Sequence, residues 1–466
     1  MFKYLISLTI AVILSFPGSS RGANIHESDN LTMDIDGNIK LFNIGLHMNW
    51  PPIALAAGLG WDSKSAFMGM GETRIGFSGA YKEDVFKWQL QLKGAFGFYS
   101  QPGLMTAMGG GLSSYEPSYL FPMQYTDNDD PDFFLSGLVD RAFFKFKLGK
   151  FDFIVGRQPI GLGVGYIWQP ADLMGTFSPI EMDKEYKPGV DAIRINLSPG
   201  KFTEISIIGV AGGPPCRHIS WPTAANPLLP SVWQTPTGNS CSPGQVRYGQ
   251  DHSSAAIRAR TTMKEWDFGI LGGYVRGDLI AGLFTSGAIG KFNLKAEAVF
   301  THDLDPAEAG DPYYSSKNNY VRAVAGFEYS FSTKKALRIT GEVYYNGFGT
   351  TDPANYMDTL KSARSSLHGE VLNPGMFYAA FAAMLEASDK IKINFMTMAN
   401  LLDPSFHLSL SLDFRLDDNS SVFLGGYLPI GEKPEILITP EGASLNLKSE
   451  FGLYPVMVFL QYKRYY

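Results

Sequence analysis

The chain has 466 residues and a formal net charge of -6, and 45% of its residues are hydrophobic and 14% aromatic. Its mean hydropathy of -0.04 excludes a bundle of membrane helices, and after the N-terminus no apolar stretch reaches the roughly 18 to 20 residues that such a helix needs. A membrane-spanning form of this chain must therefore be a β-barrel.

The first 22 residues have the layout of a secretory signal peptide. Lys3 precedes an apolar stretch over residues 4–16, and small residues follow it. Ser20 and Gly22 suit cleavage after Gly22. We expect residues 1–22 to be removed and residues 23–466 to form one domain.

Apolar and polar side chains alternate through the mature chain. Residues 86–98 place aromatic and leucine side chains on one face of an extended strand and Lys87 and Lys93 on the other. In residues 406–417, Leu410 and Ser411 likewise lie on opposite faces of the strand. Each such segment is about one barrel crossing long.

The pattern predicts about 18 strands, and because the first of them alternates poorly, 16 strands stay open as an alternative. We expect the strands at 38–48, 71–81, 85–98, 134–148, 151–158, 189–197, 201–211, 253–263, 266–276, 279–289, 291–302, 319–331, 336–347, 376–386, 391–400, 406–417, 420–430 and 451–466.

The connections between these segments alternate between tight turns and long loops. Two connections that should be long, near 277 and 402, are short. The long ones are 49–70, 99–133, 159–188, 212–252, 303–318, 348–375 and 431–450. A soluble sandwich has no reason for this asymmetry, whereas an antiparallel up-and-down barrel of the outer membrane has short periplasmic turns, long outer loops and both termini in the periplasm.

The C-terminal segment resembles the closing strand of Gram-negative outer-membrane barrels, which commonly end on an aromatic residue. Arg464 breaks the alternation and Pro455 is awkward in a paired strand. The residues in step with Tyr466 are Tyr454, Val456, Val458, Leu460 and Tyr462. The resemblance implies an all-β transmembrane barrel in the cell outer membrane, in contact with its lipid.

The loop over 159–188 is similar in position to the third loop of general porins, which folds into the barrel and narrows it. The order G-R-Q at 156–158, W-x-P-x-D at 168–172 and G-V-D-A-I-R at 189–194 also resembles porin-like barrels. Alginate-type polysaccharide exporters are similar in size and in their basic lumens. The glycines at 161, 163 and 165 do not form a nucleotide loop, because no helix follows them.

As a constriction, this loop would supply walls and charge to the lumen. The wall residues would be Tyr166, Trp168 and Gln169, and the charged ones Asp172, Glu181, Asp183, Lys184 and Glu185. The alternative is a surface loop that packs only on its neighbours.

The charges that alternate toward the lumen are mainly basic. The cations are Arg74, Lys87, Lys93, Arg141, Lys145, Lys147, Arg194, Arg258, Arg260, Lys295, Arg322, Arg338 and Arg415, and the acids are Glu72, Glu204, Glu297, Glu328, Glu342 and Asp413. Our hypothesis is a basic ladder that favours anions, formed by Arg141, Lys145, Arg194, Arg258 and Arg260. The alternative is that these cations pair across strands with the lumen acids and stiffen the barrel.

The sequence therefore predicts a porin for small hydrophilic, anionic solutes. An enzyme is not expected, because the histidines fall mainly in loops and His407 is better explained as a polar lumen residue. We expect no catalytic residue, cofactor, metal site or nucleic acid partner. A barrel scaffold of a larger complex, either an electron conduit with a cytochrome or a polysaccharide exporter, stays open, as do a homotrimer and a periplasmic partner.

The two cysteines, Cys216 and Cys241, lie in one loop rich in proline, glycine and serine. In an oxidising compartment a disulfide between them removes loop entropy from the unfolded chain, and two thiols alone are too few for a metal site. Peptide mapping without reduction should recover Cys216 linked to Cys241. Two thiols that alkylate in protein taken from the outer membrane would contradict the pairing.

Overall fold

The computed structural model describes residues 23–28, 30–50, 64–82, 85–100, 118–127, 133–181, 183–213, 246, 248–304, 317–331, 335–366, 369–439 and 442–466. The expected signal peptide and both cysteines lie outside these residues. The cleavage site and the disulfide therefore stay predictions.

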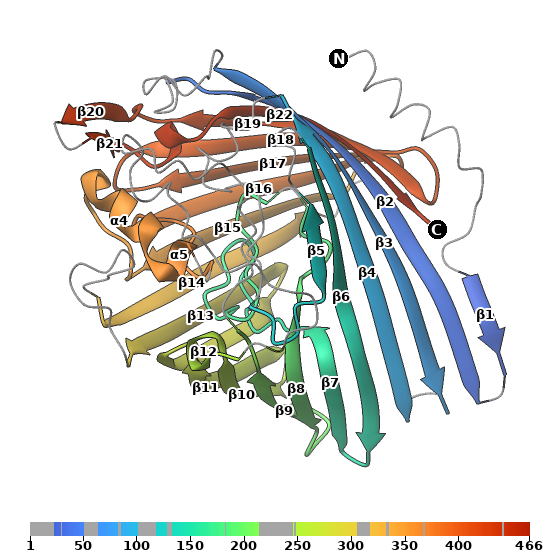
Figure 1. Cartoon of the computed structure of the whole chain (residues 1–466). Helices are drawn as coiled ribbons and strands as arrows, with labels where there is room; N and C mark the ends of the chain where they lie inside the picture. Colours follow the sequence, from blue (N-terminus) through green and yellow to red (C-terminus); the bar gives the residue numbers. More distant parts are fainter. Residues whose placement is uncertain are drawn as a thin grey trace.

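The described residues are mostly β-strands, drawn in Figure 1. The strands are β1 (Ala23–Glu27), β2 (Leu31–His47), β3 (Ser65–Tyr81), β4 (Phe86–Tyr99), β5 (Gln124–Asp127), β6 (Phe133–Leu148), β7 (Phe151–Pro159), β8 (Gly189–Leu197), β9 (Thr203–Val210), β10 (Ser254–Met263), β11 (Trp266–Val275), β12 (Asp278–Ile289), β13 (Phe292–Asp303), β14 (Asn319–Phe331), β15 (Leu337–Asn346), β16 (Phe377–Ser388), β17 (Ile391–Asn400), β18 (Ser405–Arg415), β19 (Ser420–Ile430), β20 (Glu435–Thr439), β21 (Gly442–Asn446) and β22 (Val456–Tyr465). The helices are α4 (Tyr356–Lys361) and α5 (Ala363–Ser366), with short 3-10 turns η1 (Gln250–His252), η2 (Pro353–Asn355) and η3 (Phe451–Leu453).

Eighteen of these strands form a closed antiparallel barrel. Each barrel strand pairs with its neighbours along the chain, and β2 pairs with β22 from Asn38 opposite Tyr465 to His47 opposite Val456. We call this β2–β22 contact the closing seam. Strands β1 and β5 lie outside the ring of eighteen, because β1 pairs with the start of β2 and β5 with β6, while β20 and β21 form a separate hairpin. The all-β fold and the count of 18 strands are confirmed, which leaves no place for 16.

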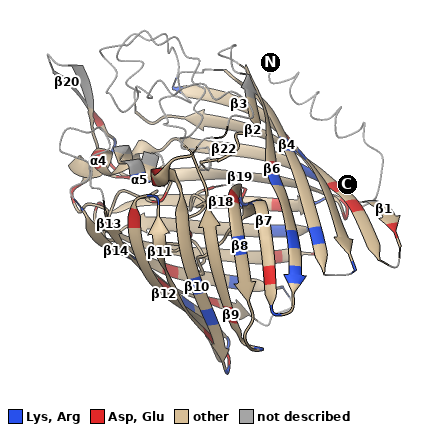
Figure 2. Ribbon diagram, turned by 60° about the horizontal axis from the view of Figure 1, so that its bottom comes forward, with Lys and Arg blue, Asp and Glu red and all other residues tan. Residues whose placement is uncertain are grey.

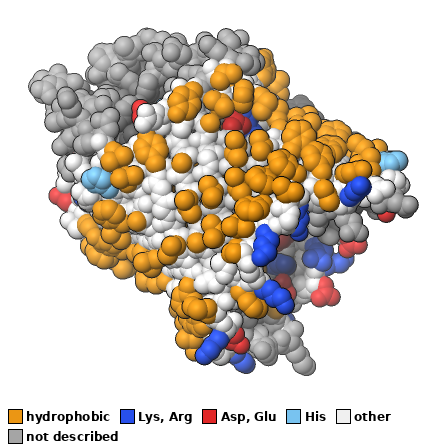
Figure 3. All heavy atoms as spheres, turned by 90° about the horizontal axis from the view of Figure 1, so that it is seen from below, with side chains coloured by type: hydrophobic (Ala, Val, Ile, Leu, Met, Phe, Trp, Pro, Cys, Tyr) orange, Lys and Arg blue, Asp and Glu red, His pale blue; other side chains and the backbone are white. Residues whose placement is uncertain are grey.

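The alternation seen in the sequence becomes an apolar outer surface. Leu283 on β12 is 64% exposed and Leu410 on β18 is 54% exposed, whereas Phe284 and Ser411, the next residues, are buried on the inside. Figure 3 shows hydrophobic side chains spread over one face of the molecule, with charged side chains gathered toward one end. A closed barrel with this exterior is built to span a bilayer, so the chain is an outer-membrane barrel.

Three strand starts differ by five residues or more from those expected. Strand β3 begins at Ser65 rather than 71, because its first residues already pair with β2. The first barrel strand begins at Leu31 rather than 38. Its residues 32–35, which precede the closing seam, pair with β1. The last begins at Val456 rather than 451: Pro455 has no N–H to donate, and Phe451–Leu453 forms the turn η3 instead.

The short connection near 277 is a two-residue turn that joins β11 to β12. Both of its residues, Arg276 and Gly277, have a positive φ, at 48° and 93°. A glycine adopts this conformation without steric cost. A tight turn thus replaces a long loop at this point of the rim.

No helix among the described residues is both long enough and apolar enough to cross a bilayer.

The outward face of β12 offers a test of the lipid-facing register. We expect Leu283→Arg to destabilise the barrel in lipid vesicles by about 2–4 kcal/mol, because the charge meets hydrocarbon. Ser286→Arg on the same strand faces the lumen and should cost much less. Urea unfolding of both variants measures the difference, and equal losses would contradict the assignment of the two faces.

Candidate functional site

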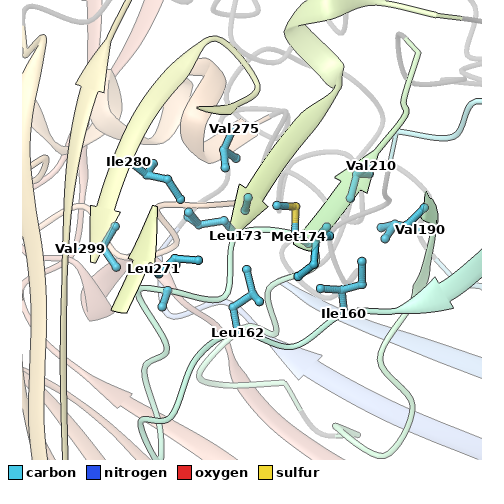
Figure 4. Close-up of a cluster of buried hydrophobic side chains, with 14 residues drawn as sticks. Ile160, Leu162, Leu173, Met174, Val190, Val210, Leu271, Val275, Ile280 and Val299 are labelled. Carbon is cyan, nitrogen blue, oxygen red and sulfur yellow. The ribbon is translucent and has the colours of Figure 1, made fainter. Parts of the chain in front are cut away.

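The loop between β7 and β8 lies inside the barrel. Ile160, Leu162, Leu173 and Met174 of this loop belong to one buried cluster with inward-facing residues of the wall. The wall residues shown with them in Figure 4 are Val190, Val210, Leu271, Val275, Ile280 and Val299. Burial of this apolar surface holds the loop against strands β8 to β13.

One inward-facing carboxylate on the opposite wall holds the tip of the loop. Glu342 on β15 accepts hydrogen bonds from the backbone N–H groups of Tyr166, Ile167 and Trp168, at N···O distances of 2.6, 2.9 and 2.7 Å. The Trp168 indole stacks on Tyr344 with ring centroids 5.4 Å apart. These contacts fix the loop tip across the lumen from its own strands.

A second wall carboxylate, Glu297 on β13, holds the segment beside the tip. It accepts hydrogen bonds from the backbone N–H groups of Val164 at 2.5 Å and Ala171 at 3.0 Å. Gly165 is needed in the turn between them, because a Cβ there would lie 1.9 Å from the carbonyl oxygen of Trp168. The run of glycines therefore lets the backbone wrap around carboxylates of the protein itself.

The far end of the loop docks on the closing seam. Asp183 contacts Lys40 of β2 at 2.7 Å and Lys463 of β22 at 3.4 Å. Burial pushes the pKa of Asp183 up, but Lys463 and Lys40 outweigh it and lower the pKa to about 2. Asp183 therefore stays ionised over the whole physiological pH range, and the loop stays docked by charge.

Two neighbours of Asp183 extend this docking. Glu185 contacts Lys40 at 2.8 Å and accepts a hydrogen bond from the Tyr465 hydroxyl at 2.7 Å. The Arg74 guanidinium carbon lies over the ring of Tyr186, 4.5 Å from the ring centroid. The loop thus contacts the walls on both sides of the lumen and crosses it.

The remaining loop residues named from the sequence support the loop itself. Asp172 is buried in an ion pair with Lys187 and accepts a hydrogen bond from the backbone N–H of Leu162 at 3.2 Å. Gln169 donates to the carbonyl of Gly165 at 3.0 Å, and Glu181 accepts from the backbone N–H of Ser178 at 3.2 Å.

Lys184 lies beside a cavity of about 260 Å³ between the loop and the wall. Burial lowers the pKa of Lys184 to about 8, against the opposing effect of Glu181 and Glu342. Arg338, Tyr427 and Phe459 also line this cavity.

A β-bulge in β6 gives the lumen an extra charged side chain. The register of β4 against β6 shifts between Gln91 and Leu92, so that Gln91 lies opposite Arg141 and Leu92 opposite Val139. Asp140 is the extra residue, and both it and Arg141 turn inward. Asp140 bonds Arg74 at 2.6 Å.

The five cations of the proposed ladder lie on β6, β8 and β10. Lys145 and Arg194 both lie directly opposite Ile154 of β7, one on each side of it. Arg258 and Arg260 follow two strands further along the wall. Figure 2 shows Lys and Arg positions gathered on β4 and β6, at the ends away from α4 and α5.

Several of these cations have acidic partners at the lumen surface. Lys145 is 3.1 Å from Asp152, and Arg260 is 3.2 Å from Glu204. Arg258 lies over the Phe284 ring, 4.2 Å from its centroid.

The other predicted pore-lining cations lie elsewhere on the wall, on β4, β15 and β18, or near the periplasmic end of β6. Lys93 contacts Glu72 at 2.9 Å, and Arg338 contacts Glu328 at 3.8 Å. Lys87 lies directly opposite Lys145 in the β4–β6 pairing. Lys147 and Arg415 are exposed near the periplasmic turns.

Another buried carboxylate, Glu450, joins the outer loops to the rim at β16 and β17. Glu450 is 2% exposed and accepts hydrogen bonds from Tyr378 at 2.5 Å, Asn373 at 2.8 Å and Asn400 at 2.9 Å. Burial raises the pKa of Glu450 to about 7, although these hydrogen bonds oppose the shift. The backbone N–H of Glu450 donates to Asp403 at 2.6 Å.

Charged residues also clamp the loop between β15 and β16. Arg364 of α5 bonds Asp278 and, at 2.8 Å, Asp303, while Arg322 of β14 bonds Glu370 at 2.5 Å. This loop therefore folds against the rim of β12 to β14.

Sequence reasoning missed Lys40, Tyr186 and Glu450. Lys40 falls in the poorly alternating first strand, and Tyr186 and Glu450 gain their roles only from contacts distant along the chain. Among the described residues, no group of three or more His, Cys, Asp or Glu side chains is placed to hold a metal ion.

Comparison with known proteins supports the barrel fold. No protein-family profile and no curated protein sequence matches this chain. Among solved structures, Acinetobacter baumannii OccAB3 is similar with a TM-score of 0.50 and 10% identity over 93% of this chain and 99% of its own. OccAB2 of the same organism gives 0.50 and 8% over 93% and 98%, and Pseudomonas aeruginosa OccD3 gives 0.49 and 9% over 98% and 97%. At these identities the likeness to the Acinetobacter structures shows the fold.

The Glu450 contacts predict a dependence of stability on pH. Because its pKa rises from an ordinary 4.5 to about 7 on folding, the folded protein keeps a proton that the unfolded chain releases. This stabilisation is complete below the unfolded pKa and is lost as the pH rises through about 7, by about 3 kcal/mol. Glu450→Gln should remove that loss.

Thermal melting of the wild type and Glu450→Gln between about pH 5 and 8 checks this. The melting temperature of the wild type should fall relative to that of the variant as the pH rises. Glu432→Gln, which changes an exposed carboxylate in the same loop, is the matched control. Parallel curves for the wild type and Glu450→Gln would contradict the prediction.

Proposed function

We propose that this outer-membrane barrel is a passive channel for small hydrophilic anions, with no chemical step. The observation that supports the proposal most is the basic wall formed by β4, β6, β8 and β10, which faces a lumen crossed by the 160–188 loop. A charge on the wall of a narrow, low-dielectric passage acts on ions far more strongly than the same charge in bulk solvent. Carboxylates, phosphates and acidic saccharides are the solute classes that fit.

The partners of the basic residues do not remove this preference. The side chains of Lys145 and Arg260 remain 33% and 41% exposed in their ion pairs. Exposed pairs of this kind are weak, about 0–1 kcal/mol, so a passing anion can compete with Asp152 and Glu204. Arg258 contacts a ring face through Phe284 and keeps its charge available to the lumen.

The acids opposite the basic wall already accept hydrogen bonds from the backbone of the loop. Glu297 and Glu342, on β13 and β15, are 2% and 3% exposed because the loop covers them. Burial under the loop removes these two acids from the open lumen surface, just as burial removes two of the inward-facing cations, Arg74 and Arg322.

Ion selectivity in a planar bilayer tests the proposal. With the purified barrel in a KCl gradient, we expect a reversal potential that indicates chloride preference. Arg258→Glu together with Arg260→Glu should abolish that preference, and Lys390→Glu together with Lys433→Glu, in a periplasmic turn and an outer loop, should not. Cation selectivity of the wild type would reject the basic ladder, and absence of conductance would favour a barrel scaffold that holds another protein.

A further inference from the structure

The loop contacts with Glu342 and Glu297 have an electrical consequence as well as a structural one. Five backbone N–H groups, of residues 164, 166, 167, 168 and 171, point at the two carboxylates at distances of 2.5 to 3.0 Å. Each N–H dipole places its positive end at a carboxylate oxygen. Burial under the loop also keeps solvent ions from contacting either carboxylate.

We propose that residues 164–171 act as a charge mask, which makes the channel anion-selective by hiding Glu297 and Glu342 rather than by the loop's own charges. This inference rests on the proposed anion channel and names the residues that set its selectivity. None of the five N–H donors belongs to a charged residue. The mask therefore changes the lumen field without adding a cation.

The surroundings of the two acids show what unmasking would do. Arg258 of the ladder lies within electrostatic range of Glu297, and its guanidinium lies over the Phe284 ring. Glu297 also lies within electrostatic range of Asp172 of the loop. A bare Glu297 would therefore offset the Arg258 charge that faces the lumen.

Glu342 has cations of its own within range. Lys295 of β13 lies 4.1 Å from the centroid of the Tyr166 ring and acts electrostatically on Glu342, as does Lys184 of the loop. If the loop tip withdraws, Tyr166 leaves Lys295, and the exposed Glu342 becomes its direct partner. Both exposures shift the lumen toward cations.

A loop variant can open the mask without changing any charge. Tyr166→Gly with Ile167→Pro and Trp168→Gly removes one N–H donor, the ring under Lys295 and the stack on Tyr344. The matched background carries Glu297→Gln and Glu342→Gln. Four proteins result: the parent, the loop variant, the Gln background, and the loop variant in the Gln background.

The reversal potential of each protein in the KCl gradient gives the result. In the Glu background we expect the loop variant to lower the chloride-to-potassium permeability ratio by about twofold or more. In the Gln background the same loop change should leave the ratio nearly unchanged. An equal loss in both backgrounds would mean that the loop acts through shape alone, and no loss in either would also overturn the mask.

Failure of the mask and failure of the proposed function give different results. A cation-selective parent rejects the anion channel and, with it, anion selectivity set by the mask. The background dependence of the loop change still shows whether residues 164–171 hide Glu297 and Glu342 from the lumen. For a barrel without conductance, carbodiimide labelling followed by peptide mass analysis gives the answer. Glu297 and Glu342 should resist labelling in the parent and react in the loop variant, and equal labelling in the two proteins would refute the mask.

Discussion

The hydrogen bonds from the backbone of residues 166–168 to Glu342 are the contact on which the interior of this barrel depends. A buried carboxylate without donors would be costly, and so would three buried N–H groups without acceptors. Each side satisfies the other, and the loop tip is thereby held across the lumen from the strands that carry it. The exposure of the basic wall and the concealment of the acids both follow from where this tip lies.

The strands could be predicted from the sequence, because alternation with a period of two reports directly which side of a barrel each residue faces. The closing strand and the tight turns could also be predicted, although the closing strand begins at Val456 rather than at 451. The charged residues near the seam were harder to predict. Lys40 lies in a strand whose alternation is poor, because some of its apolar residues face inward and pack under the outer loops. The β6 bulge at Asp140 has no sequence signature of its own, since it adds one ordinary residue to an ordinary strand.

The site could be predicted only in part from the sequence, because its main contacts use backbone donors. Tyr166 and Trp168 were identified from the sequence as wall residues, and their N–H groups, which any non-proline residue carries, bind Glu342. The glycines at 161, 163 and 165 could have suggested a nucleotide loop, which was excluded because no helix follows them. The anions that this turn binds belong to the barrel wall, which only the folded structure brings within reach.

The docking of the loop on the closing seam also constrains the order in which the molecule assembles. Lys40 comes from the first barrel strand and Lys463 from the last, and Asp183 needs both. These partners are separated by most of the chain, so loop-closure entropy delays their meeting until the ring is complete. The loop is thus docked at this end only after the two edges of the sheet have joined, and in an incompletely inserted barrel Asp183 lacks one of its two partners. Closure of the barrel and the arrangement of its interior are thereby coupled through three side chains.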